Sequence, residues 1–143
     1  MARWHESIFP ICEELNIAFV AFSPMANGFL TGKYTPDTKF EGKQDYRAGM
    51  PQYTQEGYEK AKALLELLTG MAEEKQATMG QLSLAWMLCR KPYIVPIPGS
   101  RKVERLHENI EAGKIVLTED EVAEIDAKLN TMEFEVFGGH STK

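Results

Sequence analysis

Two short, unbroken apolar runs constrain the fold of this chain more than any other feature of its sequence. Residues 17–22 (IAFVAF) stop at a Ser-Pro pair, and residues 93–97 (YIVPI) stop at Pro-Gly-Ser. Unbroken apolarity without polar alternation is typical of a strand buried on both faces of a parallel sheet. Amphipathic segments alternate with these runs, so the sequence predicts α/β units.

Helical periodicity covers most of the remaining chain. Apolar residues recur at helical spacing within residues 6–15, 54–76, 80–90 and 101–112, and again up to about Leu129. We expect Asn16 to end the first of these helices in the left-handed conformation. Gly70 lies inside the longest pattern, where it is a possible break. The helix that follows Ser100 carries Val103, Leu106 and Ile110 on its apolar face, with Ser100 as its expected N-cap.

Two Thr residues have the spacing of capping boxes. Thr78 precedes Gln81 by three residues, and Thr118 precedes Glu121 in the same way. A Thr side chain at such a position accepts from the backbone three residues on, while the Gln or Glu side chain bonds back. Both Thr residues are therefore predicted to begin helices. Residues 23–53, by contrast, show little periodicity and many glycines and prolines, as functional loops often do.

The predicted sheet is incomplete. About five helices and only two strands are expected from 143 residues, a length that fits one domain. Helices can cover the faces of a two-stranded parallel pair, but both of its edges stay open. We therefore expect residues 1–143 to form a single partial domain that belongs to a larger sheet.

Composition and charge exclude several classes of protein. A net charge of −5 argues against nucleic acid or an anionic membrane as the main partner. There is no 18-residue apolar run and no signal-peptide pattern near Met1, so we expect a cytoplasmic chain. Cys12 and Cys89 have no metal or disulfide spacing and are expected to be reduced, buried thiols.

The stretch from Ile97 to Asn109 has the chemistry of an anion site. A strand end, a turn at Gly99 and Ser100, and a helix start follow one another, and a helix N-terminus offers free N–H groups to a phosphate. Three cations lie within five residues: Arg101, Lys102 and Arg105. Arg105 shares a helix face with Glu108 and Asn109, whose side chains can read an adenine amino edge. The alternative is a solvated helix start with an Arg–Glu pair.

The segment 23–33 (SPMANGFLTGK) directly follows the first predicted strand, residues 17–22. Gly28 and Gly32 allow close approach of backbone to a ligand. In α/β folds the carboxyl ends of the strands carry the binding sites. The alternative is an ordinary glycine-rich loop.

Three segments together resemble the aldo-keto reductases: residues 23–33, residues 81–86 (QLSLAW), and residues 95–100 (VPIPGS) with Arg105, Glu108 and Asn109. The resemblance covers about residues 5–130. It implies the C-terminal part of a (β/α)8 TIM barrel, helix-rich with two clear parallel strands, in which residues 1–130 form the barrel portion and 131–143 a C-terminal tail. It also implies reduction of carbonyl compounds with NADPH. From its own residues, which include Gly138 and Gly139, we expect the segment 134–143 to be loosely held.

The resemblance assigns a cofactor site but no catalytic one. It implies that Ser100 and Arg105 contact the 2′-phosphate of NADPH, with Ile97, Gly99 and Arg101 in the same turn. Glu108 and Asn109 would face the adenine, and the pyrophosphate and ribose would lie near a further set: Ser23, Met25, Gly28 and Lys33. Several family members have Lys where this chain has Gly99, which weakens the expected preference for NADP over NAD.

The family's catalytic Asp, Tyr, Lys and His come from earlier strands, and no Tyr or His of this chain has a matching context. We therefore expect a cofactor-binding portion of an NADP-dependent reductase, without catalysis of its own. It would need a complementary barrel fragment or a longer parent chain. The alternatives are a self-associating, non-catalytic assembly module and a remnant without function.

Overall fold

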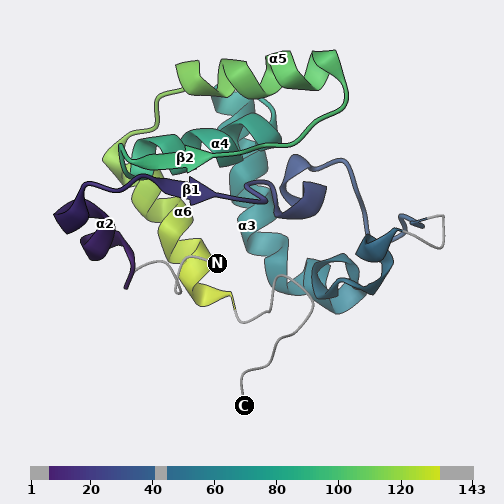
Figure 1. The fold of residues 1–143 in the computed structure, drawn as a ribbon. Coiled ribbons are helices and arrows are strands. Elements are labelled where there is room, and N and C mark those ends of the chain that lie inside the picture. Colours follow the sequence, from purple (N-terminus) through teal and green to yellow (C-terminus); the bar gives the residue numbers. More distant parts are fainter. Residues whose placement is uncertain (1–6, 41–44, 133–143) are drawn as a thin grey trace.

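The computed structural model describes residues 7–40 and 45–132 (Figure 1). Helix α2 (Phe9–Leu15) leads into strand β1 (Phe19–Ala21), and helix α4 (Met79–Arg90) leads into strand β2 (Ile94–Pro96). The two strands pair in parallel, with Val20 opposite Val95. Asn16 ends α2 in the left-handed conformation, as predicted, with φ of 51°. The predicted α/β units and the parallel pairing are thus confirmed.

One face of the two-stranded sheet is covered. Phe9 of α2, Met87 of α4 and Ile94 of β2 form a buried cluster, and Phe19 and Ala21 of β1 pack against it. The rings of Phe9 and Phe19 meet edge to face, with centroids 5.4 Å apart. This packing follows from the alternation of side chains along a strand, which sends Phe19 and Ala21 to the same side.

The opposite face of the sheet is bare in the described structure. Val20 is 57% exposed, Val95 is 46% exposed and Ile97 is 51% exposed. The prediction that both strands are buried on both faces is therefore wrong for this face. The apolar run shows that side chains on both faces are suited to burial. Among the described residues, only one face is covered by other elements.

The main core lies between three helices. The long helix α3 (Gln55–Glu74) packs against α4 and against helix α6 (Glu119–Thr131), as Figure 1 shows. Leu64, Leu68, Leu82, Ala85 and Ile125 are almost fully buried there. Gly70 does not break α3, so that possibility is excluded, because the helix is held on its buried side by residues before and after the glycine.

Both predicted capping boxes are present. Thr78 accepts from the Gln81 N–H and Thr118 accepts from the Glu121 N–H, each at 3.2 Å. The Gln81 and Glu121 side chains accept in return from the backbone N–H of the capping Thr. These bonds satisfy N–H groups that a helix start leaves unpaired.

The described residues between β1 and α3 include three short 3-10 helices: η1 (Ala26–Thr31), η2 (Tyr46–Gly49) and η3 (Pro51–Tyr53). An aromatic cluster that includes Phe29, Tyr34, Phe40 and Tyr53 organises it. The Arg47 guanidinium lies 4.8 Å from the Phe40 ring centroid and pairs with Asp45. Residues that sequence periodicity leaves unassigned are thus ordered by side-chain contacts with each other.

Helix α5 (Val103–Glu111) differs from its prediction in two ways. Its N-cap is Lys102 and not Ser100, and no side chain caps it. The Ser100 hydroxyl instead accepts from the Lys102 N–H at 3.1 Å, a local turn that competes with capping. Val103, Leu106 and Ile110 are all more than half exposed. A further short turn, η4 (Ala112–Lys114), follows α5.

Two further predictions have mixed outcomes. Cys12 is buried as expected, but Cys89 is exposed, which contradicts its assignment as a buried thiol. Cys89 lies at the end of α4, where its sulfur accepts from the Leu117 N–H. No helix in the described ranges is long and apolar enough to cross a membrane. The expected loose tail and the residues next to Met1 lie outside the described residues.

Candidate cofactor site

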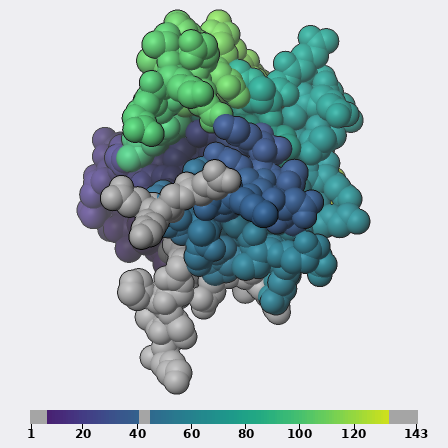
Figure 2. Space-filling model, turned by 90° about the vertical axis from the view of Figure 1, so that its right-hand side faces the viewer, coloured from purple at the N-terminus to yellow at the C-terminus, as the bar shows by residue number. Residues whose placement is uncertain are grey.

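The two predicted cofactor segments begin at the same edge of the sheet. Because β1 and β2 are parallel, residues 23–33 and 97–109 both leave from carboxyl ends. The Ile97 N–H donates to the Ala21 carbonyl at 3.0 Å, which extends the pairing to the point where the segments diverge. Figure 2 shows α5 in green and the blue segment that follows β1 on one face of the molecule. Sites in α/β folds lie at such an edge.

The segment after β1 has an unusual backbone. Asn27 and Gly28 adopt positive φ of 59° and 96°. A side chain at Gly28 would meet the Tyr34 ring at 3.0 Å, so both the conformation and the space require glycine. The Tyr53 hydroxyl donates to the Asn27 carbonyl at 3.0 Å, and the Thr31 hydroxyl donates to the Gly28 carbonyl at 2.6 Å. The loop is therefore held in one shape by contacts on its inner side.

Four basic side chains at this edge have no carboxylate partner within the described ranges. Lys33 follows η1, 5.5 Å from the Tyr34 ring centroid, and the others are Arg101, Lys102 and Arg105. Ion pairs occupy many of the other basic residues: Arg47, Lys60, Lys62, Lys75, Arg90, Lys91 and Lys114. The positive charge of the candidate site is thus available to an anion.

Glu108 is held by α4 and not by Arg105. Its carboxylate oxygen Oε1 accepts from the Thr78 hydroxyl at 2.7 Å, and its backbone carbonyl accepts from Gln81 Nε2 at 3.0 Å. The alternative of a simple Arg105–Glu108 pair is therefore not what the structure shows. Asn109 is half-buried on the same helix.

The predicted site residues differ in their surroundings. Ser23, Met25 and Gly28 are half-buried in the loop, whereas Ile97, Gly99, Ser100 and Arg101 are exposed. Sequence reasoning did not assign Thr78 or Gln81 to the site. The capping-box spacing is the signal that finds them, but that spacing says nothing about their second contact with Glu108.

The tyrosines near the site have structural roles. Burial raises the pKa of the Tyr53 hydroxyl above its usual range, and it also raises the pKa of Tyr58. Tyr34 accepts from Arg47 at 2.7 Å. The Tyr53 and Tyr58 hydroxyls therefore stay protonated at neutral pH.

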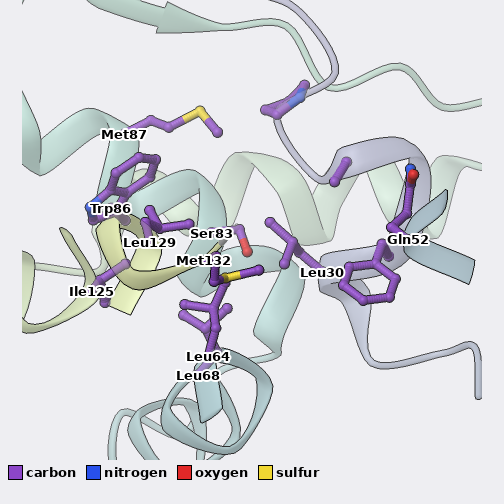
Figure 3. A pocket seen from close by; sticks show the side chains of 13 residues that line it. Leu30, Gln52, Leu64, Leu68, Ser83, Trp86, Met87, Ile125, Leu129 and Met132 are labelled. Carbon is purple, nitrogen blue, oxygen red and sulfur yellow. The ribbon is translucent and has the colours of Figure 1, made fainter. Parts of the chain in front are cut away.

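An apolar cavity of about 100 Å³ lies elsewhere, between α3, α4, α6 and η1 (Figure 3). Its wall includes Leu64, Leu68, Trp86 and Ile125, with Gln52 and Ser83 as polar members. It has no cation in its wall, so it is unsuited to a phosphate. No group of three or more His, Cys, Asp or Glu side chains among the described residues is placed to hold a metal ion.

The fold just described is found in known aldo-keto reductase structures. Residues 1–130 match the model of the Aldo/keto reductase family, and the chain belongs to that family. Its α/β architecture is part of a (β/α)8 barrel, because the structural neighbours are aldo-keto reductase barrels that it covers only in part.

Individual relatives give the extent of the match. The chain is similar to Aldo-keto reductase str7 of Strobilurus tenacellus, with 36% identity over 83% of this chain and 35% of that protein. It is 40% identical to Aldo-keto reductase yakc [NADP(+)] of Schizosaccharomyces pombe, over 82% of this chain and 34% of the relative. The glycerol dehydrogenase AKR11B4 from Gluconobacter oxydans superposes with a TM-score of 0.75 at 25% identity, over 94% of this chain and 39% of that one. The chain therefore spans about a third of the length of the curated relatives it matches.

Proposed function

We propose that this chain is the C-terminal, NADPH-binding portion of an NADP-dependent aldo-keto reductase that reduces aldehydes or ketones. The observation that carries the proposal is the convergence of two strand-end segments with four cations that have no carboxylate partner among the described residues. Family membership supports the oxidoreductase class. A relative whose name includes NADP(+) supports the choice of cofactor.

The residues present fit a dinucleotide with a 2′-phosphate. Arg105, Arg101 and the turn at Ser100 would hold that phosphate, because a guanidinium forms paired, charge-assisted hydrogen bonds with phosphate oxygens. The conformation of Asn27 and Gly28 would let the pyrophosphate approach backbone, with Lys33 balancing its charge. Ser23 and Met25 lie in the same loop. Glu108 and Asn109 would face the adenine.

NADPH supplies the hydride when it is bound, and this chain contributes binding and orientation. No Tyr or His of the chain stands in the sequence context of the family's proton donor. We therefore assign the proton transfer and the carbonyl pocket to the remaining two thirds of the barrel, supplied by a longer parent chain or by a separate fragment. The bare sheet face, with Val20, Val95 and Ile97, is where that remainder would pack.

Calorimetric titration with NADPH, with NADH in parallel, tests the cofactor site. We expect saturable binding that favours NADPH, and Arg105→Ala is expected to weaken it by about tenfold or more, because a lost charge-assisted bond is worth at least about 1.4 kcal/mol. Lys39→Ala is the matched control, because Lys39 is an exposed cation without a carboxylate partner among the described residues, outside both cofactor segments. The absence of saturation at millimolar NADPH contradicts a pre-formed site in this chain.

The two-stranded sheet also favours a second candidate, because neither of its outer edges pairs with a strand among the described residues: a non-catalytic module that self-associates through these edges. Sedimentation at several protein concentrations distinguishes the two. A concentration-independent monomer that binds NADPH supports the cofactor portion, whereas a tight oligomer that ignores NADPH supports the assembly module.

A further inference from the structure

The first turn of α4 contacts both candidate cofactor segments. On one side, Thr78 and Gln81 hydrogen-bond to Glu108 of α5. On the other side, α4 packs against η1, where a methyl group added at Gly32 would lie 2.6 Å from Met79 Sδ. A methyl group added at Gly80 would lie 3.3 Å from Met25 Sδ. Residues 78–81 therefore join two segments that are far apart in the sequence.

We propose that Thr78 is a positioning residue for nucleotide recognition: its hydroxyl fixes the Glu108 carboxylate so that it reads the adenine and leaves Arg105 to the phosphate. This inference rests on the proposed function and deepens it. Arg105 and Glu108 are three residues apart on one helix, a spacing at which an Arg and a Glu can pair. The 2.7 Å bond from Thr78 holds the carboxylate, and no ion pair forms between Glu108 and Arg105.

The two contacts of the Thr78 hydroxyl are chemically separable. Its oxygen accepts from the Gln81 N–H at 3.2 Å, and this bond caps α4. Its O–H donates a hydrogen bond to the Glu108 carboxylate. Thr78→Asp keeps a good capping acceptor but has no proton to give at neutral pH. Thr78→Ser keeps both functions. Thr78→Gly removes the hydroxyl without adding a charge and costs a helix start little.

The test measures base selectivity, which a merely structural role of Thr78 would not change. Adenosine 2′-monophosphate and inosine 2′-monophosphate share the 2′-phosphate, but inosine lacks the amino group that a carboxylate can accept from. We expect the wild-type chain to bind the adenosine nucleotide about tenfold more tightly in calorimetric titration, the effect of about one hydrogen bond. Thr78→Asp and Thr78→Gly should bring this ratio close to one, and Thr78→Ser should restore it.

Thr118→Asp is the matched control, because Thr118 heads the other capping box and has no hydrogen bond to α5 in the described structure. It should leave the ratio unchanged. An unaltered ratio in Thr78→Asp and Thr78→Gly, with unfolding temperatures near that of the wild type, overturns the positioning role while the proposed function stands. If Thr78→Asp fails to fold, Thr78→Gly decides alone. If the wild-type chain binds neither nucleotide, the proposed function is contradicted, and this inference, which rests on it, is contradicted too.

Discussion

Two glycines of α3, Gly57 and Gly70, differ in how much space surrounds them. Gly57, in the first turn of α3, faces backbone so closely that an added methyl group would lie 2.9 Å from Gln52 Cα. Gly70, in the last third of the same helix, has no atom within 4 Å of the place of a methyl group. The first glycine is required by packing, and the second is not.

We therefore expect opposite effects from the same substitution at these two positions. Gly57→Ala should destabilise the chain by about 1–3 kcal/mol, because the added methyl group has to displace backbone. Gly70→Ala should stabilise it by about 0.5–1 kcal/mol, because alanine loses less entropy in an exposed helix interior. Urea unfolding curves of the two variants measure both. Equal effects would contradict the packing at Gly57.

At the scale of elements, the helices of the main core are set by signals in their own sequence. Thr78 and Thr118 cap as predicted, and the apolar stripe of α3 becomes the buried side of the core. The segment between β1 and α3 has no such local signal. Its short turns depend on Phe29, Tyr34 and Tyr53 meeting each other, which periodicity does not encode.

The capping box of α6 is expected to weaken in acid. Its Glu121 pairs with Lys75 at 2.7 Å, and the Lys75 hydrogen bond, followed by bonding to the Thr118 backbone, lowers the pKa of that carboxyl. Because the pKa of Glu121 is lower in the folded chain than in the unfolded chain, its ionised carboxylate stabilises the fold. This contribution is fully present above the ordinary Glu pKa of about 4.3, and it is lost as the pH falls through the folded-state pKa.

Glu121→Gln isolates this contribution, because glutamine already closes the equivalent box of α4 at Gln81. The variant should keep its helix and lose part of the pH dependence of unfolding below about pH 5. Thermal unfolding between pH 3 and 7 measures it. An unchanged pH profile would show that the ion pair with Lys75 does not contribute.

At the scale of the whole molecule, the described part of the chain leaves an apolar surface without a cover. The bare sheet face includes Val20, Val95 and Ile97, and the exposed side of α5 carries Val103, Leu106 and Ile110. Apolar side chains gathered on an exposed sheet face or helix side are typical of surfaces that contact another protein or another part of the same protein. About a third of an aldo-keto reductase can form its own core between α3, α4 and α6 and still present this surface.

A monomeric form of the chain is expected to bind a hydrophobic dye such as anilinonaphthalene sulfonate. Val20→Thr combined with Val95→Thr should lower the dye fluorescence with little loss of stability, because both side chains are about half exposed already. Ala85→Ser offers a contrast, because Ala85 is fully buried in the core and its substitution should destabilise the fold. Dye binding that is unchanged by the paired substitution would place the exposed surface elsewhere.

The sequence by itself determined the α/β units, the strand pairing direction, both capping boxes and the chemical character of residues 23–33 and 97–109. These features rest on local signals: apolar runs, helical periodicity and the hydrogen-bonding groups of neighbouring residues. It also indicated that two strands are too few for a complete sheet.

Only the tertiary structure decided which sheet face is covered, that Ser100 serves a turn and Lys102 the N-cap, and that Cys89 is exposed. It also decided that Glu108 is held by Thr78, thirty residues away. Such outcomes depend on which distant side chains arrive at the same place. The sequence pattern of one segment indicates which kind of neighbour each of its residues is suited to. Which neighbour it contacts is determined by the packing of the whole chain.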